Sequence, residues 1–146
     1  MENNSGGESP AVDRYLDSTL ESVDNAERIA VQAAYEAGFH EEEIDRLGMA
    51  VRESMVNAVV HGNRYSAHKK VRLSVSKGPE RLTVRIADEG EGFDYEHLPN
   101  PLDEENLLRS SGRGIFLIRA FVDEFLVRRL SPAGTEVTLV KYMGSK

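Results

Sequence analysis

Two hydrophobic periods alternate along this chain, and they predict its helices and strands. Apolar residues recur every three or four positions over residues 21–37 and 41–61, which is the period of an amphipathic helix. Strict alternation of apolar and polar residues over 71–76 and 82–87 predicts two strands instead. The turn sequence KGPE at 77–80 lies between these strands and indicates an antiparallel hairpin.

The remaining periodicity predicts one more helix and three more strands. Residues 14–20 alternate loosely between polar and apolar positions, so we expect a first strand there. Residues 114–121 form an apolar stretch that begins at a glycine pair, which predicts a helix. Residues 124–130 and 135–142 alternate again, and the turn sequence SPAG at 131–134 joins them into a second hairpin.

The order of these elements predicts the fold class. Helices and an antiparallel sheet are partly segregated along the chain, which is typical of an α+β domain built as a two-layer sandwich. The length of 146 residues fits one domain, which we place at residues 13–143. Residues 1–12 are polar and rich in Gly and Ser, so we expect a disordered tail. Residues 88–111 lack a clean period and predict a long loop, which in a compact domain is usually functional or disordered.

Charge and composition exclude several classes of protein. The formal net charge of −7 argues against broad contact with nucleic acid, which needs clustered Lys and Arg. The chain has no cysteine, which excludes disulfides and thiolate metal sites and is compatible with the cytoplasm. The sequence has no apolar run of the roughly 18 residues that a membrane span needs. Its N-terminus has no basic start and no apolar core, so we expect no secretory signal.

Candidate chemistry begins in the second predicted helix, with Glu53, Asn57 and His61. At about 100° per residue, these three residues fall on roughly the face opposite the apolar stripe. A carboxylate and a carboxamide at positions i and i+4 are neighbours on a helix surface. The carboxylate can take a proton, and the amide oxygen can coordinate a hard cation such as Mg²⁺, which prefers oxygen ligands. Taken alone, the pattern also fits a solvated helix face.

A glycine motif, DEGEGFD at residues 88–94, follows a predicted strand. Its glycines Gly90 and Gly92 let the backbone turn sharply and let a flat ligand approach closely. Asp88 at the strand end can accept a hydrogen bond from an exocyclic amine such as that of adenine. The alternatives are a tight acidic turn and a calcium loop. An EF-hand needs Asp or Asn at its third position, where this chain has Gly90, which argues against calcium.

A second glycine motif, SSGRGI at residues 110–115, opens the predicted helix at 114–121. Backbone N–H groups at a helix start bind phosphate with the help of the helix dipole, and Arg113 could add charge-assisted hydrogen bonds. A plain helix start after a flexible loop is the alternative. Neither G-x-x-x-x-G-K-[ST] nor G-x-G-x-x-G occurs, so a nucleotide would be held by another scheme. The histidines do not have the spacing of a zinc site, and the nucleophile motif G-x-S-x-G is absent.

The combination of motifs says more than any one of them. E-x-x-x-N on a helix, D-x-G-x-G-F after a strand, G-x-G at a helix start and Gly134-Thr135 at the closing hairpin occur in this order. This arrangement resembles the GHKL ATPase superfamily, with its Bergerat nucleotide-binding fold. The sequences ESMVNAVVHGN at 53–63 and GRGIFLI at 112–118 more closely resemble the bacterial anti-sigma factor serine/threonine kinases. The resemblance covers residues 14–142.

The resemblance implies a site for ATP and Mg²⁺ and a role for each motif. Glu53 would be the general base for the hydroxyl or water that attacks the γ-phosphate, and Asn57 would hold the magnesium ion. Asp88 would recognise the adenine amine, supported by Thr135. Residues 94–111 would form a lid over the site. The other residues expected to line it are His61, Gly90, Gly92, Phe93, Ser111, Gly112, Arg113, Gly114 and Ile115.

One departure from the family pattern concerns the second glycine motif. Some relatives place a basic residue just before its serine and glycine, where this chain has Ser110. Whether Arg109 or Arg113 serves the γ-phosphate is therefore left open.

The resemblance also implies the function and the partners. It predicts a cytoplasmic serine/threonine-protein kinase that phosphorylates a small STAS-type anti-anti-sigma factor and sequesters a sigma factor. It further implies a homodimer, with no direct nucleic-acid partner and no membrane partner. A nucleotide-dependent binding switch without phosphotransfer is the main alternative. The catalytic domain of a histidine kinase is less favoured, because no helical hairpin with a phosphoacceptor histidine precedes the predicted domain.

Overall fold

The computed structural model describes residues 9–91 and 110–144 of the chain. Five antiparallel strands form one sheet in the order β1-β2-β3-β5-β4. The strands are β1 (Ser9–Asp17), β2 (Lys70–Gly78), β3 (Arg81–Ala87), β4 (Glu124–Arg129) and β5 (Thr135–Tyr142). The helices are α1 (Leu20–Ala37), α2 (Glu41–Val56), its π-helical continuation η2 (Asn57–Gly62) and α3 (Ser110–Phe121).

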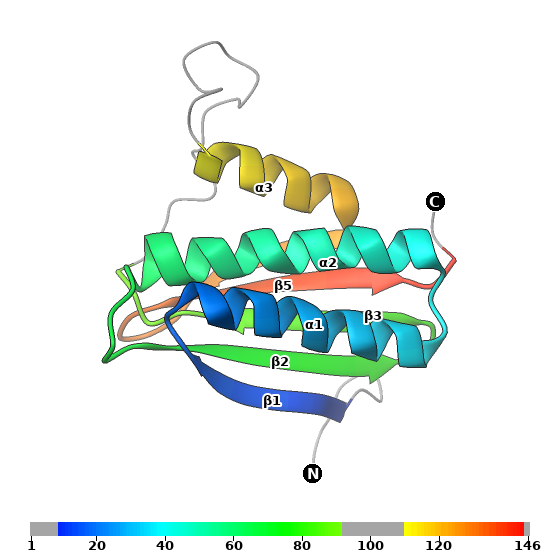
Figure 1. Cartoon of the computed structure of the whole chain (residues 1–146), viewed down its shortest axis with the longest axis horizontal. Coiled ribbons are helices and arrows are strands. Elements are labelled where there is room, and N and C mark those ends of the chain that lie inside the picture. Colours follow the sequence, from blue (N-terminus) through cyan, green and yellow to red (C-terminus); the bar gives the residue numbers. More distant parts are fainter. Residues whose placement is uncertain (1–8, 92–109, 145–146) are drawn as a thin grey trace.

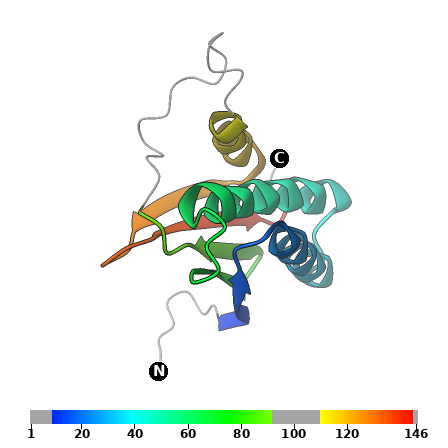
Figure 2. The ribbon, with the colours of Figure 1, turned by 60° about the vertical axis from the view of Figure 1, so that its left-hand side comes forward.

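All three α-helices lie on the same face of the sheet (Figure 1, Figure 2). The helix α2 lies between α1 and α3 and packs on β3 and β5, while α1 packs on β2 and α3 on β4. The other face of the sheet carries no helix among the described residues. The predicted α+β two-layer sandwich with an antiparallel sheet is therefore confirmed.

The core lies between the helices and the sheet, and it follows directly from the two hydrophobic periods. Alternate residues of the central strands point towards the helices and are fully buried, namely Val71, Leu73, Val75, Leu82, Val84, Ile86 and Leu139. The helices contribute apolar residues at helical spacing, namely Ala26, Ala30, Ala34, Leu47, Val51 and Met55. The buried positions of α1 are largely alanines, so this helix can approach α2 closely. A Cβ atom added to Gly48 of α2 would already lie 3.0 Å from Val31 Cγ2 of α1.

The three largest differences from the predicted element bounds concern β1, α3 and the end of α2. The strand β1 begins at Ser9 rather than at residue 14, so residues 9–12 of the predicted tail are strand, paired with the end of β2. Pairing with a neighbouring strand supplies hydrogen bonds that local polarity does not reveal. The helix α3 begins at Ser110, so Gly112 and Gly114 lie in its first turns rather than before it. Of the predicted loop and lid, residues 92–109 lie outside the described residues.

The third difference lies at the end of α2, where the predicted single helix over 41–61 changes type. Residues from Asn57 to Gly62 form a π-helix, and the Asn63 N–H bonds the Ala58 carbonyl five residues earlier at 2.8 Å. The wider π turn changes the angular step per residue. The regular helical spacing by which we grouped His61 with Glu53 and Asn57 therefore ends at Asn57.

A single carboxylate joins the start of α2 to the end of the chain's last strand. Glu43 is only 4% exposed, and its two oxygens accept hydrogen bonds from the His40 N–H at 2.9 Å and the Gly144 N–H at 2.8 Å. The first bond satisfies one of the N–H groups at the helix start that have no partner within the helix.

We expect Glu43→Ala to lower the free energy of unfolding by roughly 2–3 kcal/mol, because two charge-assisted hydrogen bonds are lost. Urea denaturation followed by circular dichroism measures the change. Glu42→Ala removes an exposed acid from the same first turn and should cost less than about 0.5 kcal/mol. Equal losses in the two variants would contradict the role of Glu43.

Candidate functional site

Three chain segments that carry predicted site residues meet at one end of the sheet. η2 ends at Gly62, Asp88 follows β3, and Thr135 begins β5. The Asp88 N–H donates to the Thr135 carbonyl at 2.9 Å. A Cβ atom added to Gly62 would lie 2.4 Å from Asp88 Oδ2, so the end of the helix touches the carboxylate. The structure thus brings together the end of η2, Asp88 of the first glycine motif and Thr135.

Asp88 is a buried carboxylate, with 5% of its surface exposed. Burial raises the pKa of this carboxyl, because the ionised form loses solvation. The backbone N–H groups of Gly90 and Thr135 act in the opposite direction, and Oδ1 accepts the Gly90 N–H at 2.9 Å. An ionised carboxylate only accepts hydrogen bonds, so Asp88 is suited to a ligand that presents an N–H group.

Three glycines hold the backbone close around Asp88. A Cβ atom on Gly90 would lie 2.0 Å from the Gly62 carbonyl oxygen, and one on Gly134 would lie 2.3 Å from the Asp88 carbonyl oxygen. Gly134 also has a φ of +116°, which favours glycine. We predicted that Gly90 lets a ligand approach, and the structure adds that it lets two chain segments approach each other. The sequence reasoning did not assign Gly62 and Gly134 to the site, although both stand beside residues that it did assign.

Glu53 near the end of α2 and Asn57 at the start of η2 are one helical turn apart, and the Asn57 N–H bonds the Glu53 carbonyl. Glu53 is partly exposed, but Asn57 is only 2% exposed, so the alternative of a solvated helix face does not hold for Asn57. The burial of Asn57 depends on how distant segments pack around this end of the helix, which the hydrophobic period of the helix alone does not predict.

Two predicted site residues carry buried polar atoms without a protein partner. Among the described residues, the buried side-chain atoms that make no hydrogen bond are Ser54 Oγ, Asn57 Nδ2 and Thr135 Oγ1. Buried polar groups in proteins are almost always paired, so unpaired ones often mark a ligand site. Asn57 and Thr135 therefore fit residues that hold a polar ligand.

A magnesium ion fits the donor set around Asn57. Among the described residues, no three His, Asp or Glu side chains gather closely enough to hold a metal ion. Mg²⁺ bound with a nucleotide needs only one or two protein ligands, since phosphates and water supply the rest. A carboxamide oxygen such as that of Asn57, once the amide is oriented for it, is one such ligand.

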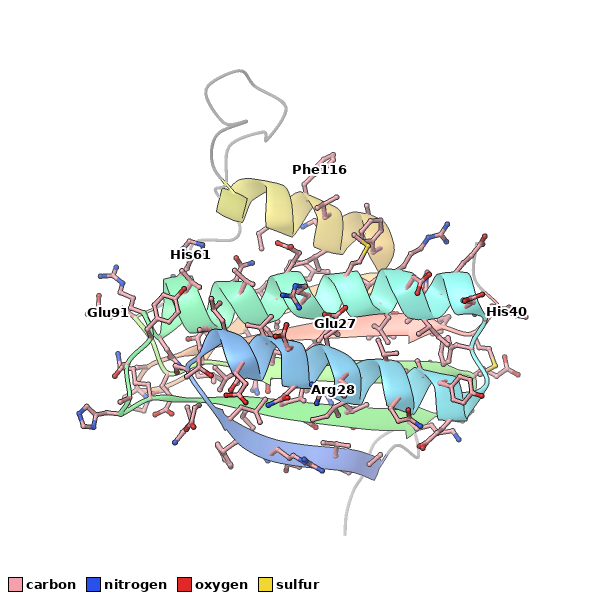
Figure 3. All side chains as sticks on the ribbon, viewed as in Figure 1. Glu27, Arg28, His40, His61, Glu91 and Phe116 are labelled. Atoms are coloured by element: carbon pink, nitrogen blue, oxygen red, sulfur yellow. The ribbon has the colours of Figure 1, made fainter. Side chains whose placement is uncertain are left out.

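His61 lies near the end of η2, beside a cavity of about 270 Å³. Figure 3 shows His61 and Glu91 at the same end of the molecule. Burial lowers the pKa of the His61 imidazole, so the neutral ring is the main form at pH 7. The other residues that line the cavity are Gly62, Asn63, Arg64, Ser66, Lys69 and Glu91.

The second glycine motif is only partly described. The backbone of Ser111, Gly112, Arg113 and Gly114 lies in the first turns of α3. Ile115 is buried in the core, so a ligand could reach this residue only through its backbone. Gly92 and Phe93 lie outside the described residues, as do Arg109 and the side chain of Arg113.

Within the part of the chain that the structure describes, no helix has the length and apolar character that crossing a bilayer requires.

The raised pKa of Asp88 has a consequence for stability. Between its ordinary value of 3.8 and the higher pKa in the folded protein, the native state binds more protons than the unfolded chain, so stability falls as pH rises. We expect the free energy of unfolding of the wild type, minus that of Asp88→Asn, to decrease from pH 4 to pH 7. Urea denaturation at several pH values measures this difference, in which the other titrating groups largely cancel. A difference that increases with pH would contradict the assignment.

Comparison with known proteins places the chain among nucleotide-binding kinases. Residues 16–141 match the family described as histidine kinase-like ATPase domain. The serine-protein kinase RsbW of Staphylococcus epidermidis is 34% identical over 114 residues, which cover 73% of this chain and 70% of that protein. The serine-protein kinase RsbW of Bacillus subtilis is 30% identical over 115 residues, covering 75% of this chain and 71% of that protein.

Two solved structures share the fold. The crystal structure of the SiaB–SiaC complex from Pseudomonas aeruginosa aligns with a TM-score of 0.68 at 14% identity, over 90% of this chain and 89% of the matched chain. The RsbU and RsbW domains of Rv1364c from Mycobacterium tuberculosis align with a TM-score of 0.63 at 20% identity. That alignment covers 92% of this chain but only 32% of the larger one.

These matches confirm the resemblance inferred from the motifs. The chain belongs to the histidine kinase-like ATPase domain family and, within it, to the family of the serine-protein kinase RsbW.

Proposed function

We propose that this protein transfers the γ-phosphoryl group of ATP to a serine or threonine hydroxyl of a small partner protein. The observation that carries the proposal is the joining of Asp88 and Thr135 at the end of the helix that bears Glu53 and Asn57. The named relatives, which are serine-protein kinases, support this reaction.

In the proposed site, Asp88 recognises the base. Its buried carboxylate accepts a hydrogen bond from the 6-amino group of adenine, and the hydroxyl of Thr135 supports the contact directly or through water. Both groups are buried, and Thr135 Oγ1 has no hydrogen-bond partner among the described residues that would compete with a ligand. A site that accepts a hydrogen bond from one base rejects a base that presents an acceptor at the same position. Two buried acceptors would then face each other without a hydrogen bond.

In the transfer step, Glu53 acts as the general base. The hydroxyl oxygen of the partner attacks the γ-phosphorus, the bond to the β–γ bridging oxygen breaks, and ADP leaves. The hydroxyl proton passes to the Glu53 carboxylate. Glu53 suits this role because its side chain is partly exposed and can meet a protein substrate, while Asn57, one turn later, is buried. Catalysis of phosphoryl transfer depends mostly on positioning and on charge neutralisation, so few protein groups are needed.

Asn57 would hold a magnesium ion that accompanies the nucleotide. When bound, the ion neutralises charge on the phosphate oxygens. The carboxamide oxygen of Asn57 is a ligand of the kind that Mg²⁺ prefers, which supports this assignment.

For partners, we propose a STAS-type anti-anti-sigma factor as the substrate and a sigma factor as the protein held in the alternative complex. The anti-sigma family that the motifs resemble supports both. We further propose a homodimer, again from the family resemblance. The helix-free face of the sheet offers a surface for it, on which Tyr15 and Leu126 are exposed apolar residues.

Transfer of labelled γ-phosphate separates a kinase from a binding switch. We expect Glu53→Gln to lower transfer from ATP to a partner serine by roughly 10²- to 10⁴-fold, because the general base is lost, while ATP affinity stays nearly unchanged. The assay measures label on the partner, and calorimetry measures ATP binding. Asp45→Asn, an exposed acid on the same helix, is the matched control. Partner binding that depends on ATP without any transfer of label to the partner by the wild type would favour the switch.

The magnesium assignment has its own test. We expect Asn57→Ala to remove the difference between ATP affinity measured with Mg²⁺ and affinity measured with EDTA, because a protein ligand of the ion is lost. Calorimetry under both conditions gives the two affinities. Asn25→Ala, a change at a surface asparagine of α1, should keep the difference. An unchanged magnesium dependence in Asn57→Ala would count against the assignment.

A further inference from the structure

Asn63 is a buried amide directly after η2 that the motif analysis did not assign to any role. The residue is 1% exposed and makes three side-chain hydrogen bonds. Its Nδ2 donates to Ser18 Oγ at 2.9 Å and to the Lys70 carbonyl at 3.0 Å. Its Oδ1 accepts the Glu89 N–H at 2.8 Å. These partners belong to three segments far apart in the sequence.

The orientation of this amide is fixed by its partners. The oxygen must face the Glu89 N–H, and the nitrogen must face the Lys70 carbonyl, so a flipped amide would lose both bonds. Ser18 extends the network, since its Oγ donates to the Lys69 carbonyl at 2.6 Å. Both hydrogens of the amide are used within the protein, so Asn63 acts on other residues rather than as a donor to a ligand.

The consequence falls on Asp88, the residue that precedes Glu89. Asn63 holds the Glu89 N–H, and the Lys70 N–H donates to the Glu89 carboxylate at 2.6 Å, so Glu89 is held by backbone and side chain alike. On its other side, Gly90 lies against the carbonyl of Gly62, the residue before Asn63. Asn63 therefore locks the turn that carries the buried carboxylate onto the end of η2.

We propose that Asn63 is the positioning residue for base recognition. It holds the turn from Asp88 to Gly90 so that the Asp88 carboxylate meets the base edge at hydrogen-bonding distance. The ligand class that follows is a purine nucleotide with an amino group at position 6, in preference to one with a 6-oxo group. This inference rests on the proposed function, in which Asp88 recognises adenine.

The test compares ATP with inosine triphosphate, which carries an oxo group in place of the 6-amine. We expect the wild type to bind ATP roughly tenfold or more tightly, the equivalent of one hydrogen bond to a charged group. Asn63→Ala should bring the ratio of the two affinities below about threefold, because the turn is no longer held. Ser18→Ala is the matched control: it breaks the same network but leaves the bond from Asn63 to Glu89, so it should keep the wild-type ratio.

The ratio separates positioning from stability, because a purely structural residue would lower the melting temperature without changing base preference. It also separates the two proposals. If the wild type itself does not distinguish the nucleotides, base recognition by Asp88 fails. Suppose instead that the wild type prefers ATP to inosine triphosphate and that Asp88→Ala loses this preference. If Asn63→Ala then keeps the full affinity ratio, only the role of Asn63 is overturned.

A second measurement uses the wild-type protein, so it tests the proposal even if Asn63→Ala does not fold. Amide hydrogen exchange without nucleotide should show the Glu89 N–H to be protected at least tenfold relative to an unstructured peptide, because Asn63 Oδ1 accepts it. Exchange of the Glu89 amide at the unstructured rate would overturn the proposal.

Discussion

The burial of the Asp88 carboxylate is the constraint on which this end of the molecule depends. An isolated buried carboxylate is strongly unfavourable, so the chain must bring hydrogen-bond donors to it. The Gly90 N–H donates to its side chain, while the Asp88 backbone bonds Thr135. These bonds need three segments within van der Waals distance of one another, and the glycines at positions 62, 90 and 134 leave room where any Cβ atom would collide. The meeting of η2, the end of β3 and the start of β5 is thus a consequence of one buried charge.

The π-helical segment η2 fits the same constraint. A regular α-helix through residue 62 would keep Glu53, Asn57 and His61 in one line, as the sequence period predicted. With hydrogen bonds to the fifth residue back, the backbone widens, and the helix ends with the Gly62 carbonyl against Gly90 and the Asn63 amide against Glu89. Short π segments are rare and occur often at functional sites, since they re-aim side chains at a cost in helix geometry. In this chain the segment begins at Asn57, the residue that we propose as a ligand of the metal.

The sequence predicted those features that depend on local pattern. The bounds of β5 and the start of α2 agree with the prediction because strict alternation and first-turn acids are local signals. It did not predict features that arise when distant segments meet. The strand β1 reaches back to Ser9 because β2 pairs with it, and the burial of Asn57 likewise depends on tertiary packing. Asn63 has no special local pattern, since its partners are 45, 7 and 26 residues away. The GHKL motifs could be recognised from the sequence because each is a contiguous stretch of residues.

The buried carboxylate and the unpaired polar atoms together imply that the site, without a ligand, lowers the stability of the protein. The pKa of Asp88 is raised, which means that the ionised group is less favourable in the folded protein than in the unfolded chain at neutral pH. Within the described part of the chain, Asn57 Nδ2 and Thr135 Oγ1 are buried without hydrogen-bond partners, and each such group costs roughly 1–3 kcal/mol. A core that packs alanines, valines and leucines at full burial can offset such costs. A ligand that supplies the missing partners binds only the folded state, so its binding free energy adds to the stability of the fold. Ligand binding at this site and the stability of this end of the sheet are therefore thermodynamically linked.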